Sequence, residues 1–438
     1  MTPEISPFGT WRSPWRAERI VAAARGLAEP RVDGSTLYWL ESRPGEAGRQ
    51  VVVALRDGHP TDVLPAPYSA RSRVHEYGGG SYTVADGVVY FSNDADQGLY
   101  RAASAGPEPL LVETGLRFAD YRLDAHRQRL LAVCEDHRGG AEPANRLVAI
   151  PLDGSAREPR VLAEGADFYS SPALSPDGRW LAWLQWQHPW MPWDGTELWL
   201  AELDAAGAPL APRRLAGGPR ESLCQPLWSP DGYLHVVSDR SGWWNLYRYQ
   251  DGNFQALCPQ EAEFGLPHWQ FGQRCYGFGA DASLVCLYTR HGLWHLARLA
   301  SPGKLQEIPL PYSDLAALTP LGDEICLLAG GPDSAPALIR VDPRHATHTV
   351  VARSSSLEID PGYIAEPRPV YFPTDQDRQA HAFFYAPRNR DFQAPPGERP
   401  PVLVKLHGGP TSATSSVLNP GTQFWSSRGL ALLDVNYG

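Results

Sequence analysis

The chain of 438 residues has little or none of several features that mark well-known protein classes. It contains two methionines and six cysteines, and the cysteines stand singly at positions 134, 224, 258, 275, 286 and 326. No C-x-x-C pair is present, which excludes the zinc and redox motifs built on that spacing. We therefore expect six buried, reduced thiols. H-E-x-x-H is also missing, so we expect no metal and no other cofactor.

An excess of positive charge and a long apolar segment are absent as well. The net charge is −10 and the isoelectric point about 5.7, whereas sequence-independent nucleic-acid binding needs a basic face. No run of 18 apolar residues could cross a membrane, and Met1 to Thr10 has neither part of a secretory signal. We expect a soluble, cytoplasmic protein without nucleic-acid or membrane partners. Whether it forms homo-oligomers stays open.

Turn-forming and aromatic residues are abundant. The sequence holds 41 glycines, 42 prolines and 15 tryptophans, a composition typical of many short strands joined by turns. The clearest internal repeat is Ser-Pro-Asp-Gly at Ser175–Gly178 and again at Ser229–Gly232. Proline presets φ, aspartate bonds its own backbone and glycine accepts positive φ, so each copy predicts a tight turn between strands.

Weaker copies of the same turn-plus-strand pattern extend the repeat over most of the chain. They start at Asp33-Gly34, Asp86-Gly87, Asp124–Arg127, Trp269–Gln273 and Leu321–Asp323. Seven units between about 30 and 355, spaced by roughly 40 to 54 residues, are typical of propeller blades. The pattern predicts a mainly β protein with a seven-bladed β-propeller over 29–360. Six or eight blades are the alternatives, and a two-sheet sandwich would not need the regular repeat.

The pattern changes after about residue 360. Pro369–Phe372 and Ala380–Ala386 indicate two strands, and Val402–Leu406 is an apolar run with one lysine. Such a run predicts a strand buried on both faces. A short helix around Thr422–Ser427 and a second buried strand at Leu430–Val435 complete a strand-helix-strand crossover, the unit of a parallel sheet. So few elements cannot cover their own sheet, and we expect the chain to be part of a longer protein.

Five segments carry a resemblance to a known family. They are Pro7–Pro14, Trp39–Pro44 with Gly48-Arg49, Val74–Gly80, His407–Pro410 and Asp434–Gly438. Over essentially its whole length the chain resembles the prolyl oligopeptidase family of serine peptidases, in particular its acylaminoacyl-peptidase and dipeptidyl-aminopeptidase-like bacterial members. The resemblance implies an N-terminal segment, 1–28, packed on a hydrolase domain. It also implies that 361–438 is the start of that α/β-hydrolase domain.

The resemblance further implies a Ser-Asp-His triad whose serine lies in a G-x-S-x-G elbow. The sequence has no such motif, and its nearest approach, Gly79–Thr83, lacks the final glycine and lies in a propeller unit. We therefore expect the chain to be truncated before the catalytic serine and to be inactive alone.

One part of the catalytic apparatus is expected within the chain. A glycine-rich loop at a strand end lets backbone N–H groups point at the oxygen that becomes negative in acyl transfer. By resemblance, the N–H of Gly409 supplies such a donor, with Gly408 as a second candidate. His407 stands where some relatives carry a tyrosine, which makes its side chain a candidate too. The plainer interpretation is a Gly-Gly-Pro turn without function.

Three further groups of residues are candidates for substrate contact. Glu76 could bind a free amino group, and the aromatic loop with Trp190 and Trp193 could line a cavity. The pair Glu261 and Glu263 could recognise an ammonium group. The plain alternatives are a solvated bend, a plug between domains and a charged surface turn.

These observations lead to one leading hypothesis and two rivals. The first is a serine exopeptidase or oligopeptidase of aminopeptidase, acylaminoacyl- or dipeptidyl-peptidase type. It hydrolyses short peptides through an acyl-enzyme under the cover of the propeller. The second is an esterase or amidase on small non-peptide acyl compounds with the same scaffold. The third is a non-catalytic propeller that binds a protein partner.

Overall fold

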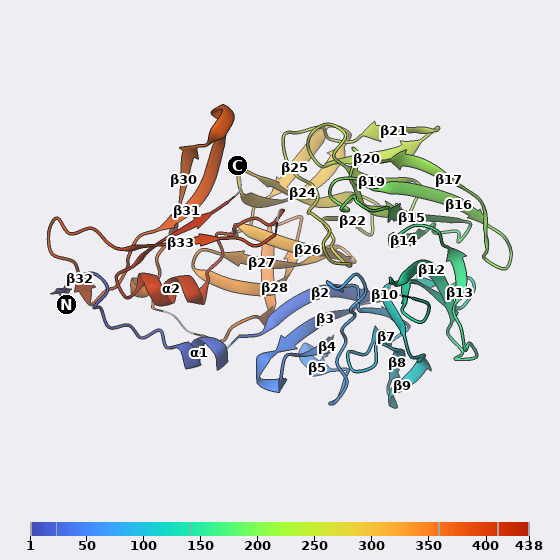
Figure 1. Ribbon diagram of the computed structural model, residues 1–438, viewed down its shortest axis with the longest axis horizontal. Helices are drawn as coiled ribbons and strands as arrows, with labels where there is room; N and C mark the ends of the chain where they lie inside the picture. The colour runs from blue at the N-terminus through green and yellow to red at the C-terminus, as the bar shows by residue number, and fades with distance from the viewer. Residues whose placement is uncertain (1, 23, 141, 358–359, 410, 437–438) are drawn as a thin grey trace.

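The computed structural model describes residues 2–22, 24–140, 142–357, 360–409 and 411–436 (Figure 1). A large group of sheets fills one side of the molecule. The C-terminal strands β30, β31 and β33 and the helix α2 lie on the other side, next to the N-terminal end of the chain.

Within these residues, seven antiparallel sheets each consist of four strands that follow one another in the chain. We number them sheet 1 to sheet 7. Sheets 1 to 3 comprise β2 (Gly26–Asp33), β3 (Thr36–Arg43), β4 (Arg49–Arg56) and β5 (His59–Asp62); β6 (Tyr82–Ala85), β7 (Val88–Ser92), β8 (Leu99–Ala103) and β9 (Gly106–Leu111); and β10 (Leu116–Asp124), β11 (Arg129–Asp136), β12 (Ala144–Pro151) and β13 (Arg160–Ala163).

Sheets 4 and 5 comprise β14 (Phe168–Leu174), β15 (Trp180–Trp186), β16 (Glu197–Leu203) and β17 (Pro209–Gly217); and β18 (Leu223–Trp228), β19 (Leu234–Ser238), β20 (Asn245–Gln250) and β21 (Asn253–Ala256). Sheets 6 and 7 comprise β22 (Tyr276–Phe278), β23 (Leu284–Arg290), β24 (Leu293–Ser301) and β25 (Lys304–Ile308); and β26 (Asp314–Leu321), β27 (Glu324–Gly331), β28 (Ser334–Asp342) and β29 (Thr347–Arg353). The prediction of a mainly β chain of four-stranded units, as in a propeller, is confirmed.

The two Ser-Pro-Asp-Gly copies form the same turn in neighbouring sheets. In the copy between β14 and β15, the N–H of Gly178 donates to the carbonyl of Ser175 at 2.9 Å, and the Ser175 hydroxyl donates to Asp177 at 2.6 Å. In the copy between β18 and β19, the N–H of Gly232 donates to the carbonyl of Ser229, also at 2.9 Å. The repeat read from the sequence is therefore a repeat of hydrogen bonds.

A bulge recurs in the first strand of five sheets. The strand register shifts after Ala28, Ala119, Ser170, Cys224 and Ala316. At each shift one residue takes a positive φ, namely Glu29, Asp120, Ser171, Gln225 and Ala317. Bulges increase local twist and re-aim side chains. These first strands lie next to one another in the order β2, β6, β10, β14, β18, and β22 lies next to β26.

Each sheet of the ring is made of consecutive strands, so no sheet combines strands from the start and the end of the ring. The ring is therefore closed by contacts between sheets 1 and 7. Trp39 and Val53 of sheet 1 pack with Cys326 and Leu338 of sheet 7 in one apolar cluster. Next to it, the hydroxyl of Thr319 donates to the carbonyl of Pro30 at 2.9 Å. Across the remaining junction, the amide of Gln225 in β18 bonds the backbone of Cys275 and Tyr276 at 2.7 Å each.

A mixed sheet lies beside the ring in the order β30 (Pro367–Pro373), β31 (Gln379–Tyr385), β34 (Ala431–Val435), β33 (Val402–Leu406), with β33 and β34 parallel. The helix α2 (Pro420–Ser426) connects β33 to β34, as the sequence predicts. The remaining elements are β1 (Glu4–Ile5), β32 (Phe392–Gln393), α1 (Ala17–Ala22) and three 3-10 turns at Pro44–Glu46, Pro361–Tyr363 and Asp375–Asp377.

The N-terminal segment packs on the C-terminal part of the chain. β1 pairs in parallel with β32, and the amide of Asn389 donates to the carbonyl of Arg12 at 2.8 Å. The guanidinium of Arg428 donates to the carbonyl of Trp15 at 2.7 Å. At the passage into the ring, the N–H of Arg25 donates to the carbonyl of Ser354 at 2.7 Å, so the entering and leaving chains run side by side.

Two expectations from the sequence differ from the structure of this chain. Within the described residues β33 is not buried on both faces, since 62% of Val404 and 71% of Leu406 are exposed. Its one strand neighbour here is β34, and little of the described chain covers its faces. In sheet 6, Trp269–Gln273 is not the turn between the first two strands. That turn is Gly279–Ser283, where the N–H of Ala282 donates to the carbonyl of Gly279 at 3.0 Å.

All six cysteines are buried and free, which confirms that expectation. Among the described residues, no helix has the length and apolar character needed to cross a membrane.

The closing contact of the ring can be tested by Thr319→Val. Thr319 is 3% exposed, so the substitution leaves the carbonyl of Pro30 without its donor at nearly constant shape. We expect a loss of about 1–3 kcal/mol in the free energy of unfolding, measured by urea denaturation. Thr319→Ser should retain the bond, and Thr349→Val on the exposed outer strand serves as the matched control. An unchanged urea midpoint for Thr319→Val would contradict this role.

Candidate active site

The loop after β33 holds the residues that the sequence assigned to an oxyanion hole. Gly409 has φ +70, in the region that favours glycine, and a Cβ there would lie 3.1 Å from the ring of Trp269. Gly408 has open space around its Cβ position. Nδ1 of the half-buried His407 lies 3.4 Å from the carbonyl oxygen of Gly408. Pro410 of this motif, like Tyr437 and Gly438 of the last one, lies outside the described residues.

Strand β33 is held in place by an ion pair with its neighbour. Lys405 and Asp434 face each other in register, and Nζ lies 2.7 Å from Oδ2. Lys405 is the one polar residue of the apolar run, and this pair accounts for it. Asp434 is 5% exposed, and its charge adds to burial in raising the pKa of Tyr385 to about 12. The loop therefore starts from a strand whose register is fixed.

Three aromatic residues from the ring form one cluster, which we call the aromatic roof: Tyr77, Trp193 and Trp269. Trp269 contacts the glycine loop. The ring centroids of Trp193 and Trp269 are 4.3 Å apart, and those of Tyr77 and Trp269 are 5.1 Å apart. The indole N–H of Trp269 donates to Oγ1 of Thr411 at 2.8 Å. The roof thus contacts the loop both at Gly409, through the ring, and at Thr411, through a hydrogen bond.

The segment that carries Trp269 also crosses the centre of the ring, and we call residues 266–273 the crossing segment. The N–H of Phe271 donates to the carbonyl of Gly78 at 2.9 Å, and Gly79 and Phe271 form an isolated parallel β-bridge. Gly79 has φ +83, and a Cβ there would lie 2.4 Å from the carbonyl oxygen of Phe271. Only glycine fits this approach. The crossing segment is therefore bound through Phe271 to the connection between sheets 1 and 2, and it leads into the first strand of sheet 6.

The chain after the glycine loop is bound to sheet 7. The hydroxyl of Ser415 donates to Asp314 at 2.5 Å, and the N–H of Leu418 donates to the carbonyl of Gly331 at 2.8 Å. Burial raises the pKa of Asp314, and the bond from Ser415 opposes it. The ring therefore holds this part of the chain at Gly409 and Thr411 and again at Ser415 and Leu418.

The structure separates the residues predicted for substrate contact. Trp193 belongs to the aromatic roof, whereas Trp190, in the same loop, is 40% exposed and has no ring contact among the described residues. Glu76 has a side chain 81% exposed and lies 3.4 Å from Arg117. Glu263 accepts from the N–H of Trp244 at 2.8 Å, which is a structural role. Glu261 is exposed.

The role of Trp269 was not predicted from the sequence. One signal was available, because the connections 63–81 and 257–275 are the longest between consecutive sheets. Long connections in compact domains are often functional. These two are the ones that meet at Gly79 and Phe271.

The geometry can supply one part of acyl-transfer chemistry. An exposed glycine N–H at the end of a strand, without a Cβ in the way, can point at a developing oxyanion. Among the described residues, no group of three or more His, Cys, Asp or Glu could hold a metal ion.

Comparison with solved structures gives the class of the protein. The chain superposes on a puromycin-hydrolysing peptidase of Mycobacterium tuberculosis with a TM-score of 0.94 and 39% identity, over 99% of this chain and 69% of that one. A mutant puromycin hydrolase complexed with PGG gives 0.94 and 35%, over 99% and 69%. A prolyl endopeptidase at 12% identity and a TM-score of 0.74, over 96% and 62%, shares the fold. No protein-family model and no curated protein sequence matches the chain.

These relatives are peptidases, and the resemblance noted from the sequence is confirmed. The chain belongs to the prolyl oligopeptidase family of serine peptidases.

The crossing segment makes stability depend on pH through His75. The ring of His75 packs on Phe168, Trp186 and Phe271, and burial lowers the pKa of this histidine to about 4. Because the unfolded chain binds this proton near pH 6.5 and the folded chain does not, stability is lost as the pH falls from 6.5 to 4.

His75→Asn removes the titrating group and tolerates the positive φ at this position. We expect the stability difference between wild type and variant to shrink by up to about 1.4 kcal/mol per pH unit within that window. Urea midpoints at pH 7.5, 6.5, 5.5 and 4.5 measure it. A difference that does not change with pH would show that the pKa of His75 is not lowered in the folded state.

Proposed function

We propose that the whole protein hydrolyses amide bonds in short peptides through an acyl-enzyme, with the N–H of Gly409 as one oxyanion donor. The observation that carries this proposal is the left-handed Gly409, exposed at the end of β33 under the ring of Trp269. The activity is proposed for the whole protein, because the chain contains no G-x-S-x-G and accounts for 69% of its M. tuberculosis relative. The 438 residues alone should not turn over substrate.

We propose that the seven sheets form a seven-bladed propeller and that 361–438 belongs to an α/β-hydrolase domain. The parallel pair β33 and β34 joined by α2 supports the second assignment. The sequence-based boundaries of 1–28, 29–360 and 361–438 need one adjustment, because β2 already begins at Gly26. The contacts of Arg12 and Trp15 with Asn389 and Arg428 support a role of the N-terminal segment as an anchor on the hydrolase domain.

The chemistry of the site follows from charge development. When a nucleophile attacks a carbonyl, the oxygen becomes negative, and a preorganised N–H stabilises that charge in a site from which water is excluded. One such donor is typically worth about 10² to 10³ in rate. On the side of the ring of sheets, the indole of Trp269 lies against the loop at Gly409.

The relatives also favour a second candidate function. Both similar enzymes are named for puromycin, a small aminoacyl amide rather than a peptide. Amidase activity on such compounds is therefore proposed beside peptidase activity. Because the family consists of peptidases, a purely binding propeller is the weakest of the three hypotheses. A cytoplasmic location is proposed from the six free thiols.

Gly409→Ala tests the oxyanion donor. The added Cβ meets the ring of Trp269 and forces an unfavourable φ, so the N–H should turn away from the reacting oxygen. We expect kcat on an aminoacyl p-nitroanilide to fall by about 10² or more, with little change in KM. Gly408→Ala is the matched control and should lose less, because nothing lies near its Cβ position. Equal losses for the two variants, or full activity of Gly409→Ala, would contradict the assignment.

Trp193→Ala tests the aromatic roof as a substrate contact. Removing a buried aromatic face should raise KM by about tenfold or more with a smaller change in kcat. Trp190→Ala in the same loop should change KM less, since 40% of Trp190 is exposed and it lies outside the roof. Steady-state kinetics with puromycin and with a tripeptide measure both. A larger effect of Trp190→Ala would place the substrate elsewhere.

A further inference from the structure

A cavity of about 620 Å³ lies at the centre of the ring. Its wall is built from the bulged first strands of the sheets, and residues 268–273 of the crossing segment form part of it. The crossing segment thus borders this cavity, and its Trp269 also lies against Gly409 of the glycine loop. His407, Gly408 and Gly409 are not among the residues that line the cavity.

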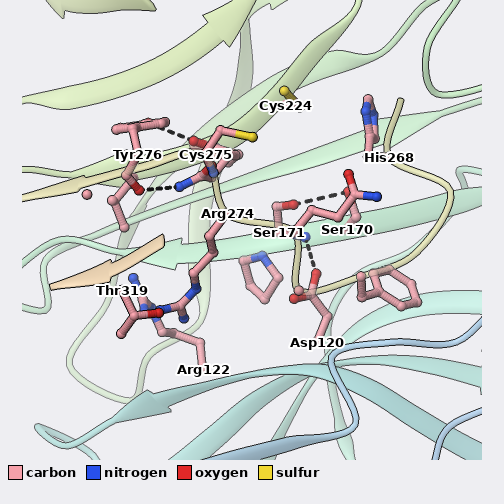
Figure 2. A pocket seen from close by; sticks show the side chains of 18 of the residues that line it. Asp120, Arg122, Ser170, Ser171, Cys224, His268, Arg274, Cys275, Tyr276 and Thr319 are labelled. Carbon is pink, nitrogen blue, oxygen red and sulfur yellow. Dashed lines mark hydrogen bonds between the residues drawn. The ribbon is translucent and has the colours of Figure 1, made fainter. Parts of the chain in front are cut away.

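Three arginines from three different sheets converge in this cavity: Arg31 in β2, Arg122 in β10 and Arg274 just before β22. Figure 2 shows the side chains of Arg122 and Arg274 directed toward one another beside Thr319. Arg31 is paired, since its guanidinium lies 3.2 Å from Glu29 and over the ring of Tyr82. In the described part of the chain, the guanidinium groups of Arg122 and Arg274 have no hydrogen bond and no ion pair.

The two carboxylates near these arginines are bound to other groups. Glu29 accepts from the N–H of Gly80 at 2.9 Å in addition to pairing with Arg31, and Asp120, in the cavity wall, accepts from the N–H of Ser171 at 2.5 Å. Burial raises the pKa of both carboxyls, and the charges of nearby arginines oppose that shift.

The other titratable groups of the wall are neutral at pH 7. Burial lowers the pKa of His75 and of His268 to about 4, and it raises the pKa of Tyr121, Tyr276, Cys224 and Cys275 above the ordinary values. Three guanidinium groups and two carboxyls then leave an excess of positive charge. Repulsion from Arg31, together with burial, lowers the pKa of Arg274 well below its ordinary value. Half-buried cations that repel one another are costly unless an anion compensates them.

We propose that this cavity binds a phosphate group, free or carried by a small molecule, between Arg122 and Arg274 with Arg31 nearby. A guanidinium fork matches the oxygens of a phosphate and can bond two of them at once. A phosphate monoester carries a charge of roughly −1.5 to −2 near pH 7 and three acceptor oxygens, which suits several cations better than a single carboxylate does. The bound group would join sheets 1, 3 and 6 across the centre of the ring.

The test uses the whole protein and needs no catalytic activity, so it is independent of the proposed function. Inorganic phosphate is titrated against sodium chloride of equal ionic strength, with the melting temperature and calorimetric binding as readouts. We expect a saturable rise of about 2–4 °C with phosphate and none with chloride. Arg122→Gln and Arg274→Gln should each weaken binding by at least tenfold. Arg213→Gln, on the exposed outer strand β17, should leave binding unchanged.

A second readout separates a ligand site from a merely structural role. Without phosphate, Arg274→Gln relieves repulsion and should not lower the melting temperature, whereas a structural arginine would. Tighter binding of glucose 6-phosphate than of inorganic phosphate would identify a phosphorylated small molecule as the ligand, and equal binding would identify free phosphate. The proposal is overturned if phosphate acts no differently from chloride, if citrate binds and phosphate does not, or if the two variants bind phosphate as the wild type does.

Discussion

The contact between Trp269 and Gly409 is the constraint on which the functional part of the structure depends. Here the ring of sheets meets the loop after β33, and both the ring and the N–H group of the indole take part in the contact. The indole ring occupies the space that a Cβ on Gly409 would need, and its N–H donates to the hydroxyl of Thr411, two residues further along the chain. Because Trp269 in turn packs on Trp193, the position of the loop depends on sheets 4 and 6 of the ring.

The crossing segment links this contact to the centre of the ring. Its backbone pairs with Gly79 on the opposite side, and the close approach leaves no room for a side chain there. One short segment therefore contacts the glycine loop at Trp269 and lines the arginine cavity with residues 268–273. A ligand in that cavity would contact the same segment that positions the aromatic roof. The cavity is lined by arginines and the loop by glycines, and the crossing segment contacts both.

Local patterns in the sequence were enough to predict the repeat and the loop, but not how they meet. The Ser-Pro-Asp-Gly turns and the glycine motif depend on neighbouring residues, so their types and spacing define them. Trp269 has no such pattern, since its role comes from Tyr77, Trp193 and Thr411, which are all far from it in the chain. The bulges offered a partial signal: Glu29, Ser171 and Gln225 each precede a proline inside a strand, where proline marks irregular pairing.

Exposure was the least predictable property. Val402–Leu406 has the composition of a buried strand, yet Val404 and Leu406 are exposed in this chain, because hydrophobicity indicates what a strand can pack against and not whether that cover lies within these 438 residues. Similarly, Glu76 and Glu263 have the same side chain in loops of the same ring, but only the second is enclosed and bonded to backbone. Such differences arise from tertiary packing alone.

The central claim is that the N–H of Gly409 stabilises the oxyanion. A crystal structure of the whole protein with a covalently bound peptide aldehyde or boronate tests it directly. The account predicts that the oxyanion oxygen of the adduct lies about 2.7–3.1 Å from the nitrogen of Gly409. An adduct whose oxygen is held by other donors and lies beyond hydrogen-bond distance of Gly409 would contradict it.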